Sequence, residues 1–257
     1  RKAQDIRESP FSVSAIGPRE IEAKAVVNMI DILSYESGVS TIKGQLNIRG
    51  TSGYTMGAGT RSLLLLDGIP MLGSAAGNVT WATIPTSEVD RVEIVKSGGS
   101  ALYGSSAMGG VVNIITRNAP HKPETRISTK IGVYSHPRVD EWRWRESRGL
   151  LYNTEISHSR SIGNHAAWIR IQKRSDDGFM ELNWEEAVNI SAKLKLNFGS
   201  AHSAAFFINI LDDKAGLTSI WKSSANPFEA PEGSSNDGTQ GRKVVLNGHY
   251  NYVYSPD

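Results

Sequence analysis

The sequence contains no cysteine among its 257 residues. Disulfide frameworks, thiolate zinc sites and cysteine nucleophiles are therefore excluded, whereas the cellular compartment stays open. The sequence also lacks an excess of charge of either sign, because 28 Lys and Arg residues stand against 26 Asp and Glu residues, for a formal net charge of +2. This balance gives no electrostatic footprint for a nucleic acid, and we expect no nucleic-acid partner.

Long apolar runs are missing as well. A transmembrane helix needs about 18 consecutive apolar residues, and the densest runs here cover only residues 63–66 and 111–115. The sequence therefore excludes a helical membrane protein but not a transmembrane β-barrel, whose strands alternate. Nothing near Arg1 has the pattern of a signal peptide, and we expect that end to be processed or engineered.

The first half of the sequence predicts a compact α+β domain. Short apolar runs between glycines are typical of buried strands and occur at residues 62–67, 92–96 and 111–116. Pro18 opens a helical segment that ends near Lys24, and Asn28 can cap a second helix. Ile30 and Leu33 lie at helical spacing on one face of that second helix.

The best domain boundary is the segment 118–123, which has two prolines and no apolar residue larger than alanine. We expect an N-terminal extension at residues 1–10, the α+β domain at residues 11–120 and a β domain at residues 121–257.

From residue 125 onward, apolar residues recur at every second position, so each strand has one apolar and one polar face. About six strands are predicted, near residues 125–134, 141–161, 165–174, 186–199, 204–213 and 242–254. The connections at 162–164 and 199–202 are short, whereas those at 175–185 and 214–241 are long and polar. Short turns at one end and long loops at the other are typical of outer-membrane β-barrels.

A soluble antiparallel sandwich explains the alternation but not the segregated loop lengths. In a membrane barrel, the charged face would line a watery lumen and includes Arg126, Lys130, Lys193 and Lys195. Tyr250, Tyr252 and Tyr254 at one strand end suggest an interfacial aromatic girdle. The second half alone does not separate the two architectures.

The most informative segment is residues 90–117, DRVEIVKSGGSALYGSSAMGGVVNIITR. A strand enters a glycine turn, a short helical turn, a second glycine-rich bend and another strand, with small residues where backbones pass closely. It resembles the plug of a TonB-dependent outer-membrane receptor. Three further segments match that family in the same order: 9–16 (SPFSVSAI), 46–50 (LNIRG) and 64–70 (LLLDGIP). Two departures are Gly98-Gly99 in place of Gly-Pro, and no proline before Gly38-Val39.

The resemblance implies an α+β plug domain followed by antiparallel transmembrane β-barrel strands, about six of about 22. Six strands cannot close a barrel, and an open edge in lipid leaves unpaired amides, so we expect an N-terminal portion of a longer protein. The implied location is the outer membrane of a Gram-negative bacterium, in contact with outer-membrane lipid. The implied partner is the inner-membrane energy-transducing protein TonB, whose binding segment, the TonB box, is not evident in residues 1–8.

The resemblance also implies energy-coupled uptake of a scarce nutrient, most often a ferric siderophore, with the plug displaced by pulling on the N-terminus. A cobalamin or haem receptor is the alternative within the family, and only His136 lies in an expected outer loop. A signalling or adhesion module that retains the plug fold is an alternative from another class. We expect no resident cofactor or metal, because Asp176, Asp177 and Glu181 lack calcium-loop spacing and suggest a solvated charge cluster.

Candidate site residues come from the resemblance. The outward loops of the plug would touch a metal chelate or similar small ligand through Tyr54, Thr55, Met56, Asn78 and Trp81. Aromatic and amide side chains suit a ligand of mixed polarity, although Tyr54 and Trp81 could equally pack the plug. Arg49 and Lys96 lie where the family places basic residues that pair with acids of the inner barrel wall, as a plug-barrel lock.

No motif supports an enzyme. Walker and nucleophile-elbow motifs are absent, and residues 57–62 lack the third glycine of a dinucleotide fingerprint. Ser219 and Lys222 form a lone Ser-x-x-Lys in a long loop, and the six histidines include no i, i+4 pair. We therefore predict no catalytic residues.

Overall fold

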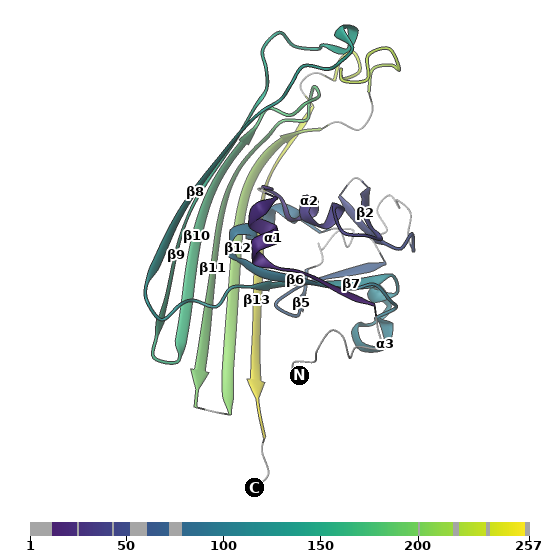
Figure 1. The fold of residues 1–257 in the computed structure, drawn as a ribbon. Coiled ribbons are helices and arrows are strands. Elements are labelled where there is room, and N and C mark those ends of the chain that lie inside the picture. The colour runs from purple at the N-terminus through teal and green to yellow at the C-terminus, as the bar shows by residue number, and fades with distance from the viewer. Residues whose placement is uncertain are drawn as a thin grey trace. The chain divides into compact units, whose positions relative to one another are not determined.

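The computed structural model describes residues 12–24, 26–42, 44–51, 61–71, 79–199, 201–217, 221–234 and 237–254. The chain divides into two compact units, Arg1–Asn118 and Ala119–Asp257, and each is described by itself (Figure 1). None of the helices in the described ranges is long and apolar enough to cross a membrane.

The first unit is an α+β fold around a five-stranded sheet of order β1-β6-β7-β4-β5. Its main elements are β1 (Val13–Ile16), α1 (Pro18–Ala23), α2 (Met29–Ser34), β2 (Val39–Ile42), β3 (Gln45–Ile48), β4 (Ser62–Leu66), β5 (Ile69–Pro70), β6 (Val89–Val95), α3 (Ser100–Tyr103) and β7 (Gly110–Thr116). Strands β4 and β7 pair in parallel, and β2 and β3 form a separate antiparallel hairpin.

The predicted helices are confirmed. Pro18 is at the start of α1, and the Asn28 side chain caps α2 by accepting a hydrogen bond from the Ile30 amide at 3.3 Å. The buried face of α2 is formed by Met29, Ile32 and Leu33, so the expected pairing of Ile30 with Leu33 is only half right.

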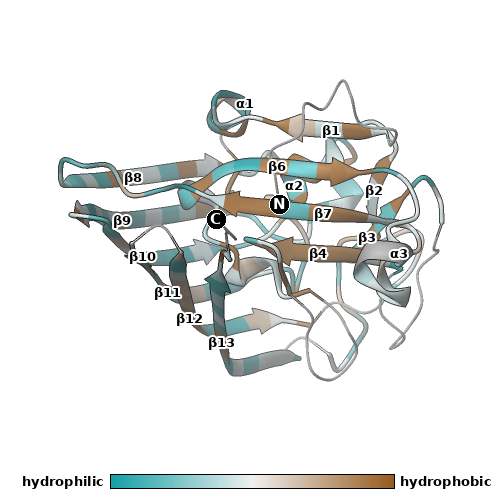
Figure 2. Cartoon of the chain, turned by 90° about the horizontal axis from the view of Figure 1, so that it is seen from below, coloured by the Kyte–Doolittle hydropathy of each residue, from teal (hydrophilic) through white to brown (hydrophobic). Residues whose placement is uncertain are grey.

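The core of the first unit lies against β4 and β7. All five residues of β4 are buried, and Leu63 and Leu65 cluster with Ala107 and Val111. Such continuous burial requires an apolar run rather than an alternation, as the sequence of this strand shows. Figure 2 shows β4 in brown along most of its length and β7 in brown on both sides of a paler section, in contrast to the regular teal bands of the second unit.

Two glycine-containing turns explain the sequence motifs. Asp67 (φ 51°) and Gly68 (φ 82°) form the turn between β4 and β5. The Asp67 carboxylate accepts hydrogen bonds from the Thr116 amide at 3.0 Å and hydroxyl at 2.9 Å. Gly110 (φ 140°) has no room for a side chain, because a Cβ would lie 2.6 Å from the Val95 carbonyl oxygen. Backbone geometry therefore dictates these motif residues.

The second unit is a six-stranded antiparallel sheet in which sequence neighbours pair, in the order β13-β12-β11-β10-β9-β8. Its strands are β8 (Glu124–Val133), β9 (Leu150–Ile162), β10 (His165–Asp176), β11 (Glu185–Phe198), β12 (His202–Gly216) and β13 (Gly238–Tyr252). The six predicted strands are confirmed, with one boundary wrong: β9 begins at Leu150, not at residue 141. Residues 141–149 alternate Trp and Arg as a strand would, but they lie in a connection whose 3-10 turn is Asp140–Trp142.

The connections are segregated by length. Residues 134–149, 177–184 and 217–237 join strands at one end of the sheet, and short turns at Gly163 and Gly199 join them at the other. Figure 1 shows the three long connections together, beyond the loop end of the sheet. This segregation is the predicted arrangement. At the end of the sheet that carries the long connections, β12 and β13 are longer than predicted.

Each strand of the second unit has an apolar face and a polar face. The apolar face is exposed and includes Ile127, Ile131, Ile156, Ile169, Ile171, Ile190, Leu194, Phe206, Ile208, Val244 and Leu246. The polar face includes the buried residues Asn153, Glu155, Ser157, Arg170, Asn189, Ser191 and Asn209. The polarity is therefore inverted relative to a water-soluble sheet, as the alternating bands along the strands in Figure 2 illustrate.

Candidate functional site

The predicted apex residues Tyr54, Thr55, Met56 and Asn78 lie outside the described residues. Trp81 is described, and it is 7% exposed. Its indole N–H donates a hydrogen bond to the Gly44 carbonyl oxygen at 2.6 Å. The side chain therefore packs within the first unit and links the 3-10 turn Trp81–Thr83 to the start of β3.

The two predicted lock residues have different surroundings. Arg49 is exposed, has φ 52°, and its amide donates to the Gly38 carbonyl oxygen at 2.7 Å. Lys96 is buried, and its Nζ lies 2.6 Å from Glu36 Oε1. Sequence reasoning missed Glu36, because no local pattern links positions so far apart in the chain.

The Glu36 carboxyl is acidified by this pair. Burial alone would raise the pKa of Glu36, but the hydrogen bond and positive charge of Lys96 outweigh burial and lower the pKa below its usual value. Lys96 and Glu36 are thus held as an ion pair at neutral pH. Because the pair is largely shielded from water, removal of either partner would leave an unpaired charge in the protein, which is unfavourable.

The polar face of the second unit carries a hydrogen-bonded network centred on Arg170, which is 1% exposed. Its guanidinium donates to Glu155 Oε2 at 2.9 Å through Nε and lies 2.8 Å from the same oxygen through Nη2. The network continues across β11 and β12, where the Asn209 amide donates to Asn189 Oδ1 at 2.9 Å and to Ser191 Oγ at 2.8 Å. Buried polar groups of this kind are stable only when they are paired, and these are.

The three long connections are joined by an aromatic cluster. The rings of Phe179 and Phe228 meet edge-to-face at 6.0 Å, Trp142 contacts Phe228 at 5.8 Å, and Tyr134 contacts Phe179 at 6.5 Å. We call Tyr134, Trp142, Phe179 and Phe228 the loop cluster. Because each connection contributes to it, the loops are held in one arrangement.

Hydrogen bonds between side chains and backbone groups reinforce the loop cluster. The Trp144 indole donates to the Phe179 carbonyl oxygen at 3.0 Å, and Arg145 donates to the Gly178 carbonyl oxygen. Glu181 receives the Ala230 amide at 2.8 Å, and Asp177 receives the Leu150 amide at 2.9 Å. The acidic residues 176, 177 and 181 are therefore engaged in the fold.

This corrects the expected solvated charge cluster. Asp176 is 7% exposed and accepts hydrogen bonds from the Tyr134 hydroxyl and the Gly178 amide, both at 2.9 Å. Burial, followed by the Asp176 carboxylate, raises the pKa of Tyr134 to about 12. No group of three or more His, Asp or Glu residues suited to a metal ion occurs within the described ranges.

A shallow basic and aromatic concavity, with a volume of about 20 Å³, lies beside the loop cluster. It is lined by Tyr134, Ser135, His136, Pro137, Arg143, Trp144, Arg145, Ser147, Arg148, Gly149 and Phe179. Arg145 stacks over the Trp144 ring, with Cζ 4.7 Å from the ring centroid. Arg145 is engaged with the carbonyl oxygens of residues 177 and 178, and Arg143 lies 3.3 Å from Glu146 Oε2. The exposed guanidinium groups of Arg143 and Arg148 beside aromatic rings still suit an anionic ligand that carries flat or aromatic parts. The alternation of Arg and Trp in the sequence is the signal that could have indicated this surface.

Comparison with known proteins gives the family of the first unit. The TonB-dependent Receptor Plug Domain family matches residues 5–111. The vitamin B12 transporter BtuB of Vibrio vulnificus strain CMCP6 is 33% identical over 135 residues, which cover 51% of this chain and 22% of the transporter. The iron-regulated outer membrane virulence protein of Vibrio cholerae O395 is 33% identical over 128 residues, which cover 45% of this chain and 18% of that protein.

Solved structures extend the likeness to the second unit. The ferric citrate transporter FecA in its unliganded form has a TM-score of 0.77 at 18% identity, covering 98% of this chain and 38% of FecA. The siderophore receptor PirA from Pseudomonas aeruginosa has a TM-score of 0.62 at 23% identity, covering 81% of this chain and 35% of PirA. The fold is thus a plug domain followed by strands that resemble the start of a barrel. The chain spans about a fifth of the length of the curated relatives.

Proposed function

Because the chain belongs to the TonB-dependent outer-membrane receptors of Gram-negative bacteria, we propose that the full-length protein takes up an anionic ferric siderophore. The observation that supports this ligand class is the basic and aromatic character of the loop surface around the shallow concavity. Long connections of outer-membrane barrels face outward, so this surface meets arriving ligand first. Ferric chelates with carboxylate or catecholate groups carry negative charge, which guanidinium groups bind in bidentate geometry.

Uptake against a concentration gradient needs an energy source, and we propose the inner-membrane protein TonB as the partner that supplies it. A pull on the N-terminal segment would shift the plug after ligand has bound. The predicted apex residues Tyr54, Thr55, Met56 and Asn78 stay proposed ligand contacts of the plug. The burial of Trp81 and its hydrogen bond to Gly44 favour the packing alternative for that residue. The task is binding and release without covalent chemistry, in keeping with relatives that are named transporters and receptors.

Arg49 and Lys96 stay the proposed basic half of the plug-barrel lock. Arg49 is exposed and carries a full positive charge, so it can meet an acid of the barrel wall. Lys96 already has Glu36 as an acidic partner at 2.6 Å. A barrel acid that engages Lys96 therefore competes with Glu36, and the lock depends on both.

Cobalamin uptake is the second candidate, because relatives at 31–35% identity are vitamin B12 transporters. The similarity to these transporters covers 57% of this chain or less. The ligand therefore depends on the outward loops. Haem uptake has weaker support, since His136 is the one histidine of the three long connections, in residues 134–149. In a signalling or adhesion module, the plug fold would be retained but no ligand would be transported.

Ligand binding by the detergent-extracted full-length protein tests the proposal. Fluorescence-quenching titrations with a ferric catecholate, ferric citrate, cyanocobalamin and haemin should show sub-micromolar affinity for one ferric chelate. The Arg143→Gln/Arg148→Gln variant should bind that chelate about tenfold more weakly, because two charge-assisted contacts are lost. Arg138→Gln, an exposed arginine of the same connection outside the concavity, is the matched control. Tight binding of cyanocobalamin alone, unaffected by either variant, would overturn the siderophore assignment.

A further inference from the structure

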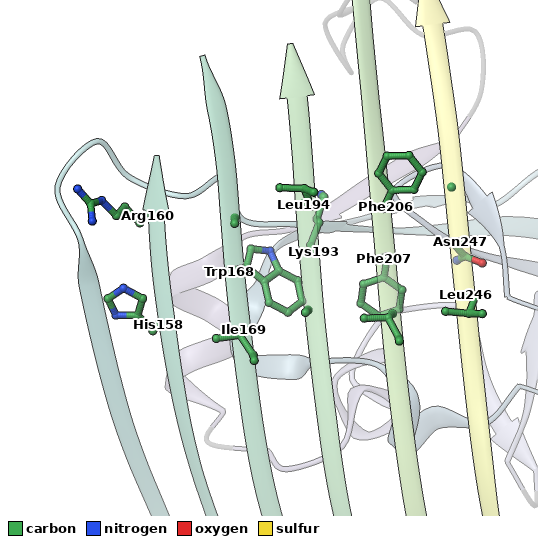
Figure 3. A pocket seen from close by; sticks show the side chains of 14 residues that line it. His158, Arg160, Trp168, Ile169, Lys193, Leu194, Phe206, Phe207, Leu246 and Asn247 are labelled. Carbon is green, nitrogen blue, oxygen red and sulfur yellow. The ribbon is translucent and has the colours of Figure 1, made fainter. Parts of the chain in front are cut away.

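The apolar face of the second unit contains a groove near its short-turn end, with a volume of about 630 Å³. Figure 3 shows Arg160 and His158 on β9 at one end of the groove and Leu246 on β13 at the other. The groove is bordered by two rows of cross-strand neighbours on the apolar face: Arg160, Ala167, Leu194, Phe206 and Gly248 in one, and His158, Ile169, Ala192, Ile208 and Leu246 in the other.

Small residues create the groove. Ala167, Ala192 and Gly248 stand among large apolar side chains in the two rows. The surface is hollow at these three positions, where a larger side chain would fill the space. The groove crosses from β9 to β13, which at about 4.8 Å per strand spacing is about 19 Å. That is a length suited to an extended acyl chain, and the lining is almost wholly apolar.

Arg160 gives this groove a polar mouth. It is exposed, it belongs to the apolar face, and it stands two residues before Ile162, where β9 ends. A guanidinium facing lipid is unfavourable at the bilayer midplane, by about 2–4 kcal/mol, and much less so at the interface. Its planar fork matches a phosphate in bidentate geometry, so the headgroup region is where this residue is stable.

Aromatic side chains place Arg160 at headgroup depth. Tyr250 and Tyr252 are exposed at the short-turn end of β13, and His202 stacks on Tyr252 with ring centroids 4.8 Å apart. Such girdles mark the interface between hydrocarbon and headgroups. Tyr250 pairs across the sheet with Ala204, within one row of the groove. The Arg160 end of the groove therefore lies at the interface between lipid headgroups and hydrocarbon, and the rest of the groove runs between apolar side chains.

We propose that the groove binds one diacylglycerophospholipid of the leaflet on the short-turn side, which in outer-membrane barrels is the periplasmic leaflet. Arg160 holds the lipid phosphate, assisted by His158, whose Nδ1 lies 2.8 Å from the Thr125 hydroxyl. One acyl chain lies along the small residues of the groove. Charge complementarity at one end and an apolar channel at the other select a phospholipid over a second protein copy.

Native mass spectrometry of the full-length protein, released from membranes in mild detergent and offered phosphatidylethanolamine, tests the site. We expect one retained phospholipid per protein, and about a tenfold lower bound fraction in Arg160→Gln and in Ala167→Leu, which fills the groove. Lys173→Gln and Val188→Leu are matched controls on the same face, outside the groove, and should retain the lipid as wild type does.

Three outcomes would overturn the proposal. Equal retention by all variants would show that the lipid is non-specific. A retained mass corresponding to lipid A in place of a diacyl phospholipid would assign the surface to the other leaflet. A dimer mass lost in Ala167→Leu would make a second copy the occupant. The heat-unfolding midpoint of each variant, measured alongside, distinguishes loss of the site from loss of the fold, and ferric-chelate binding reports separately on the proposed function.

Discussion

The two units of the chain use β-structure in opposite ways. In the first unit, β4 is buried along its whole length and consists of Ser62 and four leucines. In the second, β10 alternates between a buried Arg170 and exposed Ile169 and Ile171. The first unit buries its apolar side chains, as a protein surrounded by water does. The second unit exposes its apolar side chains and turns its hydrogen-bonding side chains to the other face, as a sheet beside lipid does, because lipid cannot satisfy polar groups.

The difference shows where stability resides. Loss of an apolar contact matters in the first unit, and loss of a hydrogen-bonded charge matters in the second. Substitutions in the full-length protein in detergent test this contrast.

Arg170→Met should lower the free energy of unfolding by about 3–5 kcal/mol, because Glu155 is left as a buried charge without its partner. Adding Glu155→Leu should restore part of the loss, since the stranded charge is removed. Ile169→Ala, the neighbour on the apolar face, should cost about 1 kcal/mol or less. Urea unfolding measures all three, and equal losses for Arg170→Met and Ile169→Ala would break the contrast.

Gly110→Ala should destabilise the first unit by about 2–3 kcal/mol, because φ 140° is strained for alanine and its Cβ would lie 2.6 Å from the Val95 carbonyl oxygen. Gly17→Ala is the matched control, with nothing within 4 Å of its added Cβ. Limited proteolysis should cut the Gly110→Ala variant faster than wild type. A wild-type cleavage rate would contradict the packing described for β6 and β7.

Asp67→Ala should cost about 1–2 kcal/mol, because the turn loses both hydrogen bonds to Thr116 and a residue tolerant of φ 51°. Hydrogen exchange should become faster at the Thr116 amide. Asp90→Ala, which removes an exposed ion pair with Arg91, should leave that amide unchanged.

Lys96→Met should reduce stability by about 1 kcal/mol in a pH-dependent way. The Glu36 pKa is lowered in the folded state, so the pair stabilises above the ordinary glutamate pKa near 4.5 and its contribution is lost as pH falls through the lowered value. The stability difference between wild type and variant should therefore be constant at neutral pH and shrink in acid. A difference that grows in acid would contradict the ion pair.

Tyr134→Phe should have the smallest effect, about 0.5–1 kcal/mol at neutral pH, from the lost hydrogen bond to Asp176. The Tyr134 pKa is raised to about 12, so its contribution is complete below pH 10 and is lost as pH rises toward 12. The difference in tyrosinate absorbance between wild type and variant should emerge only near pH 12. A difference at pH 10 would place Tyr134 in water.

Sequence patterns predicted the elements whose signal is local. The Asn28 cap, the apolar β4 run and the alternating strands all follow from neighbouring residues. The Trp-Arg alternation of residues 141–149 misled, because loop-to-loop hydrogen bonds from Trp144 and Arg145 override a short strand-like period.

The unpredicted features depend on residues far apart in the chain. Glu36 meets Lys96, Asp176 meets Tyr134, and Arg170 meets Glu155 only after the sheets have formed. Local periodicity gives the face on which a residue lies but not its partner. Site residues that act in pairs are therefore the last to be found from sequence.

We expect the apolar face of the second unit to lie against lipid. Because the chain has no cysteine, nitroxide labels can be placed singly in this region at Ile190, Ile208 and Leu246, and at the polar-face positions Arg126 and Lys195, which are not buried. In membranes, electron paramagnetic resonance should show high collision with oxygen and low collision with a water-soluble nickel chelate at the first three positions only. Nickel accessibility there equal to that of an exposed loop position such as Arg138 would contradict the claim and make the sheet part of a soluble sandwich.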